Sequence, residues 1–181
     1  SSSFGDITLD SFTAGSLSLS LSSGDFIGGD IEVNNNIQFK NSNGDGTFSG
    51  TKAESLNMQS SNGDITINDS TINSVNLQDS NGKISSDKLT TGAIVANLSN
   101  GSINLSGDFT GNLDIKSTNG GISLTTWEKQ SYYLCDFKTS LGSIKLGGSK
   151  SGNIYTNNSK STNIFKIRNS NGDITVNFAE E

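Results

Sequence analysis

A short motif returns along this chain at a nearly constant interval, and this repeat constrains the fold more than any other feature. One full copy is Ser-Ser-Asn-Gly-Asp-Ile-Thr-Ile at residues 60–67. The turn glycines that mark successive copies are separated by 19, 20, 19, 19, 19, 19, 22 and 30 residues. They are Gly5, Gly24, Gly44, Gly63, Gly82, Gly101, Gly120, Gly142 and Gly172. Such a period is typical of solenoids, in which each repeat buries its apolar face by stacking on its neighbours.

Apolar residues alternate with polar ones on both sides of each marker glycine. Ile65 and Ile67 follow Gly63 by two and four residues, and Leu56 and Met58 precede it by seven and five. The apolar set that follows the marker glycines is interrupted at Gly28, Gly46 and Ser86. Alternation with a period of two indicates strands with one buried face, because a helix would repeat every three to four residues. A further apolar position, which predicts a third and less regular side, is filled by Phe12, Ile31, Ile72, Leu89, Phe109 and Trp127.

These patterns predict an all-β fold, a single-stranded parallel β-helix of about eight coils of roughly 19 residues each. We expect each strand to pair with its equivalent in the next coil along the chain, because the side chains match from coil to coil. The general preference for right-handed crossovers predicts a right-handed helix. Residues 1–181 are interpreted as one domain, with regular coils at 5–120, irregular coils with insertions at 121–172 and a C-terminal strand at 173–181.

Asn precedes most of the marker glycines, and the pair Asn-Gly predicts a tight corner between two strands. Glycine adopts positive φ without a steric cost, and Asn tolerates the left-handed region better than most residues. Stacked corners would align the Asn side chains in a ladder in which each amide bonds to the next. Ser23 and Leu141 stand where Asn would be expected. The predicted corner residues are Asn43, Gly44, Asn62, Gly63, Asn81, Gly82, Asn100, Gly101, Asn119, Gly120, Asn171 and Gly172.

An acidic residue often follows the marker glycine, and stacking would place four of these residues in one column. They are Asp6, Asp25, Asp45 and Asp64. Carboxylates about 5 Å apart repel one another by roughly 1 kcal/mol per neighbour in water. Backbone donors and solvent, or a bound cation, would offset that repulsion. Because calcium requires several converging oxygens, one carboxylate per coil makes a sparse cage, and we predict neither a metal site nor a cofactor.

The composition excludes several classes of function. The net charge of −6 and the lack of a basic run argue against nucleic-acid binding, which depends on Lys and Arg. The chain has no His and a single cysteine, Cys135, so a thiol protease or a zinc site is not expected. Cys135 falls on the inward side of its strand, and we expect it to be buried and unreactive. No apolar run is long enough to cross a membrane.

Aromatic residues gather where the repeat is broken, between Gly120 and Gly172. Insertions in a solenoid form loops that project from the stack, often on a binding face. The candidate ligand-binding residues are Trp127, Lys129, Tyr132, Tyr133 and Tyr155. An exposed cluster of this kind would stack on sugar rings or hold a protein partner. The alternative is that Trp127 and Tyr133 face inward, which leaves Tyr132 and Tyr155 as the exposed members.

The repeat also resembles a known family. Ser-Asn-Gly-Asp-Ile-Thr-Ile, with the copies Ser-Asn-Gly-Ser-Ile-Asn-Leu at 99–105 and Ser-Asn-Gly-Asp-Ile-Thr-Val at 170–176, is similar to the repeat of the DUF4097 family of bacterial surface proteins, which are grouped as adhesins. The resemblance covers nearly the whole chain. It implies a β-helical fold and an extracellular or cell-surface location, behind an N-terminal anchor that precedes Ser1. It implies no catalytic residue.

The sequence therefore favours a non-enzymatic binding or structural module of the bacterial cell envelope, with a cell-wall glycan, a host glycan or a surface protein as partner. The alternative is a β-helical carbohydrate-active enzyme, a polysaccharide lyase or hydrolase, which would need clustered carboxylates on one face. Asp69 and Asp87 fall at similar places in adjacent coils and could be neighbours. The acids expected to face outward are Asp69, Asp79, Asp87, Asp114 and Glu128.

The ends of a β-helix expose unpaired strand edges, which favour end-to-end self-association. We expect the polar tails Ser1–Ser3 and Glu180–Glu181 to be too short to cover these edges fully. Self-association is thus a further expectation.

Overall fold

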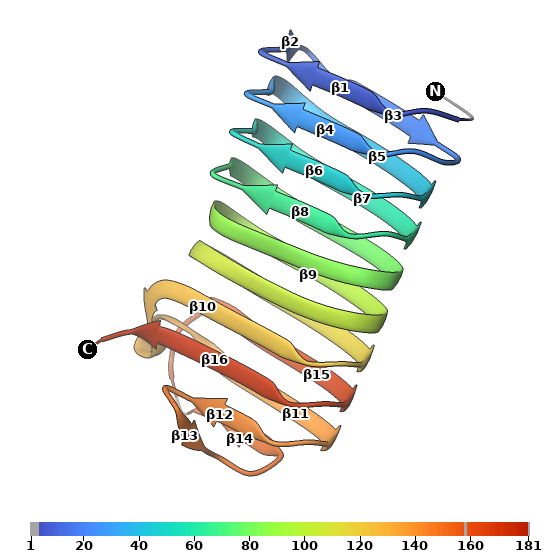
Figure 1. Cartoon of the computed structure of the whole chain (residues 1–181). Helices are drawn as coiled ribbons and strands as arrows, with labels where there is room; N and C mark the ends of the chain where they lie inside the picture. The colour runs from blue at the N-terminus through green and yellow to red at the C-terminus, as the bar shows by residue number, and fades with distance from the viewer. Residues whose placement is uncertain (1–3, 158, 181) are drawn as a thin grey trace.

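The computed structural model describes residues 4–157 and 159–180, so Ser1–Ser3 and Glu181 of the predicted tails lie outside it. The chain winds into an elongated stack of coils, and the strands of each coil pair in parallel with those of its neighbours (Figure 1). The prediction of a parallel β-helix is confirmed.

Two long columns of strands form the main faces of the stack (Figure 1). The first face consists, in spatial order, of β1 (Ile7–Asp10), β4 (Phe26–Gly29), β6 (Gly46–Ser49), β8 (Ile65–Asn68), part of β9 (Thr71–Asn119), β10 (Ile122–Lys129), β16 (Ile174–Ala179) and β12 (Ile144–Leu146). The second face consists of β3 (Leu17–Leu21), β5 (Glu32–Asn43), β7 (Lys52–Asn62), further parts of β9, β15 (Ile164–Asn171) and β11 (Leu134–Leu141). Shorter elements are β2 (Thr13–Ala14), β13 (Ser149–Lys150), β14 (Ile154–Thr156) and a 3₁₀ turn, η1 (Gln130–Tyr132).

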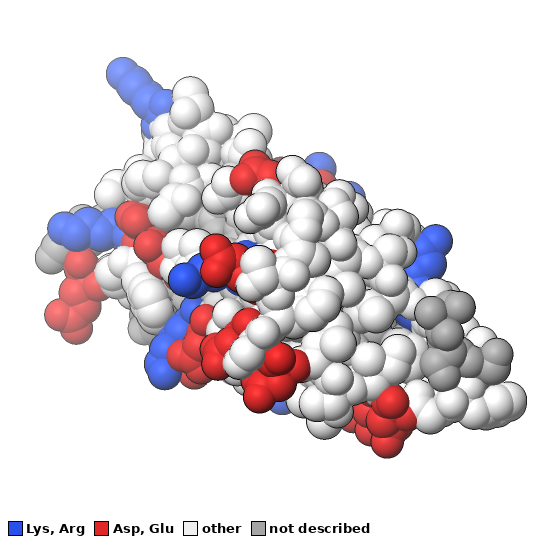
Figure 2. Space-filling view, turned by 90° about the horizontal axis from the view of Figure 1, so that it is seen from above, with Lys and Arg blue, Asp and Glu red and all other residues white. Residues whose placement is uncertain are grey.

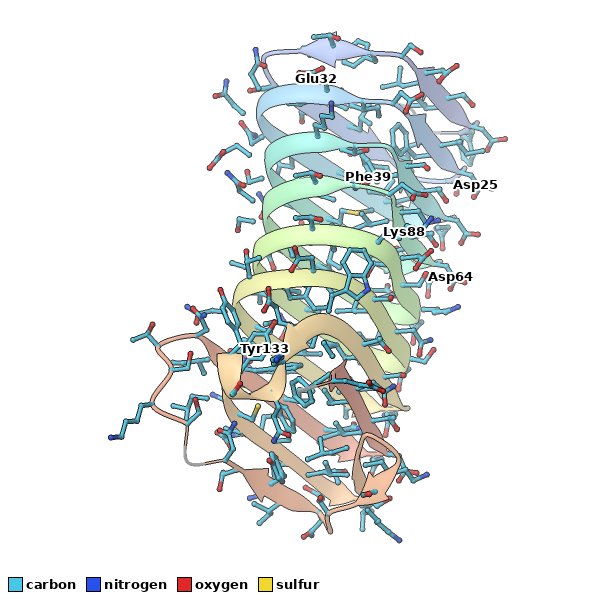
Figure 3. All side chains as sticks on the ribbon, turned by 90° about the vertical axis from the view of Figure 1, so that its left-hand side faces the viewer. Asp25, Glu32, Phe39, Asp64, Lys88 and Tyr133 are labelled. Atoms are coloured by element: carbon cyan, nitrogen blue, oxygen red, sulfur yellow. The ribbon has the colours of Figure 1, made fainter. Side chains whose placement is uncertain are left out.

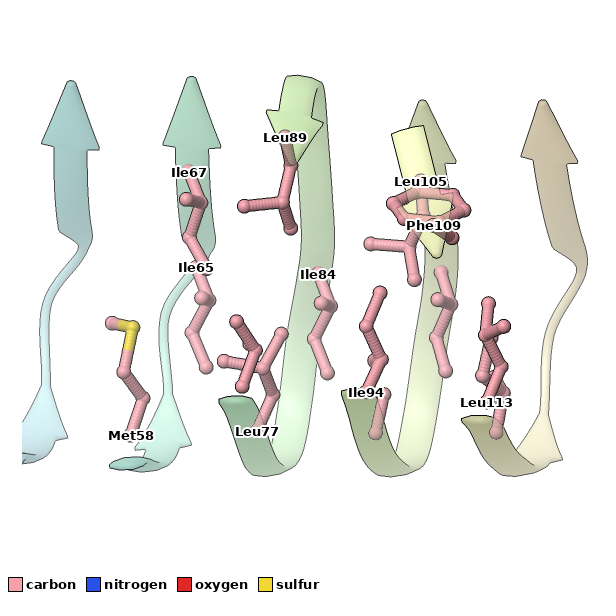
Figure 4. Close-up of a cluster of buried hydrophobic side chains, with 14 of the residues drawn as sticks. Met58, Ile65, Ile67, Leu77, Ile84, Leu89, Ile94, Leu105, Phe109 and Leu113 are labelled. Carbon is pink, nitrogen blue, oxygen red and sulfur yellow. The ribbon is translucent and has the colours of Figure 1, made fainter. Parts of the chain in front are cut away.

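The interior is lined by the alternating residues that the sequence pattern predicts. Ile65 and Ile67 of β8 are fully buried, and so is Leu56 of β7. Figure 4 shows such side chains in rows between the strands of successive coils. Burial of an aliphatic side chain contributes roughly 1.5–3 kcal/mol, so these rows hold the coils together. Cys135 is also fully buried, as predicted, and burial raises the pKa of its thiol to about 12.

The glycines that interrupt the first apolar set make room for aromatic rings. A Cβ atom at Gly28 would lie 2.5 Å from the side chain of Ile31 and 2.9 Å from the ring of Phe26, and one at Gly46 would lie 2.8 Å from the ring of Phe39. The ring centroids of Phe26 and Phe48 are 4.7 Å apart, and those of Phe26 and Phe39 are 5.3 Å apart. Small and large residues thus compensate between neighbouring coils, which keeps the interior closely packed.

The Asn-Gly corners stack directly on one another. From Asn62 onward, each Asn amide nitrogen donates to the side-chain oxygen of the Asn in the preceding coil of the stack, at 2.7–3.1 Å. The column contains Asn43, Asn62, Asn81, Asn100, Asn119 and Asn171. The glycine that follows each Asn has positive φ, for example 122° at Gly44 and 141° at Gly63. The residue pair therefore supplies both the sharp turn and the bond between coils.

The order of the coils departs from the prediction at the C-terminal end. β16 lies between β10 and β12, and β15 lies between β9 and β11 (Figure 1). The last repeat of the chain is thus inserted between two earlier repeats. Our expectation that each strand pairs with its equivalent in the next coil along the chain is wrong here.

Corner chemistry gives one physical reason for the inserted order. Asn171 lies directly beyond Asn119 and extends the Asn column, with 2.7 Å between the amide nitrogen and the side-chain oxygen. Leu141, which has no amide, takes the last place in the stack and is 71% exposed. Stacking in sequence order would put Leu141 in the middle of the column and interrupt its hydrogen bonds.

Charge on the second face gives another reason. Lys166 of β15 lies opposite Asp114 on one side and Asp136 on the other. Sequence order would instead bring Asp114 and Asp136 directly opposite each other. Opposite charges across neighbouring strands stabilise a sheet, and like charges destabilise it, so the inserted order is favoured.

The two ends of the stack differ. At the C-terminal end, β13 pairs antiparallel with β12, and β14 pairs antiparallel with β11, so short strands cover both edges of the last coil. At the other end, β1 pairs with β4 and β3 pairs with β5, and their outer edges carry no further strand of the described chain. End-to-end association through this edge stays a prediction.

Candidate functional site

The outward side chains of the second face form polar columns. Parallel pairing in register places Gln59 opposite Gln78, and Arg168 between Lys116 and Lys138. One column, four residues before each marker glycine, contains Lys40, Gln59, Gln78, Asn97, Lys116, Arg168 and Lys138. A second column, two residues before the glycine, consists of hydroxyl side chains at Ser22, Ser42, Ser61, Ser80, Ser99, Thr118, Ser170 and Ser140.

These columns line a groove of about 890 Å³ that crosses adjacent strands of β7, β9, β15 and β11. Its outward residues are Gln59, Gln78, Ser80, Asn97, Ser99, Lys116, Thr118, Lys138, Ser140, Arg168 and Ser170. Its floor comes from the buried position three residues before each glycine, namely Ser60, Asp79, Leu98, Ser117 and Asn169. Hydroxyl, amide and cationic groups dominate this surface, so it can make many hydrogen bonds to a polar ligand. We name it the polar groove.

The cations of the polar groove are only partly compensated. The Lys116 ammonium lies 3.2 Å from the carboxylate of Asp114. The guanidinium of Arg168 pairs with the carboxylate of Asp136 and donates to the Asp136 backbone oxygen at 2.7 Å. Lys138 forms no ion pair with another residue of the described chain. Figure 2 shows acidic side chains in patches on a largely uncharged surface.

Asp79 in the groove floor is buried, so our expectation that it faces outward is wrong; it is only 6% exposed. At the same position in another coil, the Asn41 amide donates to the backbone oxygens of Gly24 and Gly44, at 2.9 and 3.0 Å. A carboxylate cannot donate in this way. Asp79 accepts from the backbone N–H of Asn81 at 3.3 Å, and its other oxygen has no hydrogen-bond partner among the described residues. Burial, with a smaller contribution from the charge of Asp64, raises the pKa of Asp79.

Replacement of Asp79 by Asn should therefore stabilise the protein by about 1 kcal/mol at pH 7, because the Asn amide can donate to backbone oxygens as Asn41 does, whereas the carboxylate cannot. The pKa of Asp79 is raised in the folded state, so the folded protein binds this proton more tightly than the unfolded chain. Stability from this group thus improves as the pH falls through the folded-state pKa. The advantage of Asp79→Asn should shrink between pH 7 and pH 4, as measured by denaturant unfolding. Asp87→Asn, at an exposed site, is the control, and an undiminished advantage at pH 4 would contradict the prediction.

The structure does not bring the five predicted ligand-binding residues together as one exposed cluster. Trp127 is 52% exposed, so its interpretation as an inward residue is wrong, and Lys129 is also exposed. Tyr133 is fully buried, in agreement with the inward alternative, and lies inside the lower coils in Figure 3. Tyr132 and Tyr155 are half-buried. Ligand binding by these residues stays a prediction.

Tyr133 explains why Trp127 faces outward. The phenol of Tyr133 donates to the backbone oxygen of Phe109 and lies 3.2 Å from the hydroxyl of Thr126. Burial raises the pKa of this phenol. Thr126, beside the core, is buried, and the ring of Tyr133 fills the interior there. Because side chains alternate along β10, Trp127 then points to solvent.

The two other tyrosines are held by hydrogen bonds. The Tyr132 hydroxyl donates to the Thr110 backbone oxygen at 2.8 Å. The Tyr155 hydroxyl accepts from the side-chain amide of Gln130, and its ring stacks on Phe137 with centroids 5.8 Å apart. These contacts attach the inserted segments to the last coils.

The predicted Asp column is present at the corners, and backbone donors satisfy it. The carboxylate of Asp6 accepts a hydrogen bond from the backbone N–H of Asp25 at 2.9 Å. In the same way, the carboxylates of Asp25, Asp45 and Asp64 accept from the backbone N–H groups of Asp45, Asp64 and Lys83, at 2.7–2.8 Å. Asp25 and Asp64 lie along one edge of the stack (Figure 3). One oxygen per carboxylate is thus engaged, which offsets the repulsion between neighbours. Within residues 4–157 and 159–180, no group of three acidic or cysteine side chains is placed to hold a metal ion.

Asp69 and Asp87 do lie on adjacent coils, where the Asp69 backbone N–H donates to the Asp87 backbone oxygen at 2.9 Å. The Asp69 carboxylate, however, pairs with the Lys88 ammonium at 3.2 Å. A hydrogen bond from Lys88 to this carboxylate raises the pKa of Lys88. The pair therefore differs from the two opposed carboxyl groups that glycoside hydrolysis requires.

Comparison with known proteins adds the family. The sequence profile described as Toastrack DUF4097 matches residues 7–177, nearly the whole chain. The chain belongs to this family. No curated protein and no solved structure matched it. In the described part of this Toastrack chain, no helix has the length and apolar character needed to cross a membrane.

Sequence reasoning missed the polar groove because, among the outward side chains, it considered only the acidic and the aromatic ones. The signal was available in the same repeat. Positions four and two residues before each marker glycine carry amides, cations and hydroxyls, with Ser99 and Thr118 as examples. Parallel stacking turns such a repeated position into a column, and therefore into a continuous surface.

Proposed function

We propose that this protein is a non-enzymatic binding module of the bacterial cell envelope, an adhesin-type protein that holds an extended glycan in the polar groove. The observation that carries the proposal is the run of outward amide, hydroxyl and cationic side chains across adjacent strands. A polymer of sugars presents hydroxyl groups at regular intervals, and the groove presents matching donors and acceptors at each strand. Residues such as Gln78, Asn97 and Ser99 would bind it.

Membership of the family supports this proposal. The resemblance to surface proteins grouped as adhesins favours an extracellular or cell-surface location, and the glycan would come from a cell wall or from a host. A long, shallow surface suits weak contacts repeated along a polymer, which together give useful avidity.

The proposal is tested by blocking the groove. Ser99 is exposed in its middle, and a Trp side chain there would fill the space that the polymer needs. We expect Ser99→Trp to weaken binding to soluble polysaccharides, dextran and hyaluronan, at least about tenfold in affinity electrophoresis. Ile27→Trp, at an exposed position on the first face, is the matched control and should bind as the wild type does. Absence of binding to both polymers, or equal binding by Ser99→Trp, would refute the proposal.

A further inference from the structure

The polar groove has two chemically different halves. The long element β9 passes through the groove in three successive coils. On β7 and on the first two of these passes, the outward column consists of uncharged amides, Gln59, Gln78 and Asn97. On the next three strands, the same column consists of Lys116, Arg168 and Lys138. Paired strands lie about 4.8 Å apart, so each half is about 10 Å long. We name them the amide half and the cationic half.

The cationic half is assembled by the inserted order of the strands. β15 supplies Arg168 and lies between β9, which supplies Lys116, and β11, which supplies Lys138. Arg168 is held in place by its bonds to Asp136, so the centre of this half is fixed. The lysines on either side have exposed, flexible side chains that can adapt to a ligand.

Positive charge is in excess at this place although the protein as a whole carries −6. The same three strands carry Lys116, Arg168, Lys138 and Lys166 against Asp114 and Asp136, which leaves a local excess of two positive charges. In the amide half, buried Asp79 is the acidic residue of the groove lining. The outward column of the groove therefore changes from uncharged to positive along its length.

We propose that the polar groove selects polysaccharides that carry carboxylates on some of their sugars, with the uncharged sugars on the amide half and a carboxylate on Lys116, Arg168 and Lys138. This inference rests on the proposed function. Ammonium and guanidinium groups bind carboxylates through charge-assisted hydrogen bonds, and amides and hydroxyls bind sugar hydroxyls. A polymer with a charge on every unit, such as polyphosphate, would be repelled by the net negative charge of the rest of the molecule.

The test compares three probes on the full chain by isothermal titration calorimetry at low and at physiological salt. Hyaluronan carries a carboxylate on every second sugar, dextran is neutral, and polyphosphate is densely charged. The variant Lys116→Gln/Lys138→Gln removes two cations and keeps Arg168, whose bonds to Asp136 support the strands. The control variant Lys52→Gln/Lys83→Gln changes the net charge equally at exposed lysines outside the groove.

We expect wild type and control to bind hyaluronan at least about tenfold more tightly than Lys116→Gln/Lys138→Gln does at low salt. This difference should shrink at higher salt, since exposed charges are screened. Dextran should bind all three proteins equally. Equal hyaluronan binding by both double variants, or binding of polyphosphate in the groove that is tighter than binding of hyaluronan, would overturn the carboxylate assignment. The proposed function would still be tested separately, by the effect of Ser99→Trp on polysaccharide binding. If no probe binds the wild type, both the inference and the proposed function fail.

Discussion

Deletion of residues 164–181 should destabilise the protein much more than deletion of an end coil. These residues contain β15 and β16, which lie inside the stack with a coil on each side. Phe165, Ile167, Ile174 and Val176 are fully buried there. At roughly 1.5 kcal/mol or more for each side chain, their removal costs about 6 kcal/mol. For a chain of this length we expect the melting temperature to fall by about 10 °C or more.

The matched control deletes residues 1–23, of which residues 4–23 form the coil at the opposite end. In a solenoid, stability is close to a sum over coils and the interfaces between neighbours. The control removes one interface, whereas deletion of 164–181 removes two and leaves β11 and β12 without their parallel partners, β15 and β16. Limited proteolysis should then cut within residues 121–163, and mass spectrometry would locate the cuts. Equal losses of stability, with 121–163 still resistant, would mean that the last repeat lies at the end of the stack.

The architecture could be predicted from the sequence because a single local rule repeats. The interval between marker glycines, the inward pairs such as Ile65 and Ile67, and the Asn-Gly corners each point to the same parallel β-helix, and the structure has it. Because the spacing, the apolar pattern and the turn residues all favour the same structure, the fold can be predicted from the sequence. Even the interruption at Gly46 has a local cause, since the ring of Phe39 needs the space.

The order of the last coils could not be predicted from the interval between repeats. A repeat can stack on any equivalent repeat, and its position in the chain does not decide which. The deciding differences are small: Asn171 rather than Leu141 beside Asn119, and Lys166 rather than Asp136 beside Asp114. The residues of these pairs can be found in the sequence, but they predict the order only if the alternative stacking orders of the last repeats are compared.

The site was harder to predict than the fold. The aromatic residues drew attention because they are rare in this chain, yet Tyr133 fills the core and Tyr132 and Tyr155 attach the inserted segments through their hydroxyls. The third apolar position of the repeat did not predict the orientation of Trp127, because Thr126 and Tyr133 fill the interior there and Trp127 faces solvent. A groove, by contrast, is made of common polar residues, and only the stacking of coils makes it continuous.

Replacement of Gly101 by Ala should cost about 4 kcal/mol or more, among the largest effects of any single substitution in the chain. Gly101 has φ of 136°, and a Cβ atom there would lie 1.7 Å from the backbone oxygen of Gly82 in the preceding corner. Neither backbone can move aside without breaking the hydrogen bonds between the two stacked corners, such as that from the Asn100 amide to the Asn81 side-chain oxygen. Differential scanning calorimetry of the variant measures the loss.

Gly5→Ala separates the two causes of this cost. Gly5 also has positive φ, 109°, but a Cβ atom there would meet nothing within 4 Å. Gly5→Ala should therefore cost about 1 kcal/mol, from backbone strain alone. The difference between the two variants measures how closely the corners approach. If both variants lose the same stability, the corners are not in direct contact, and the Asn and Asp columns built on that contact would not connect the coils.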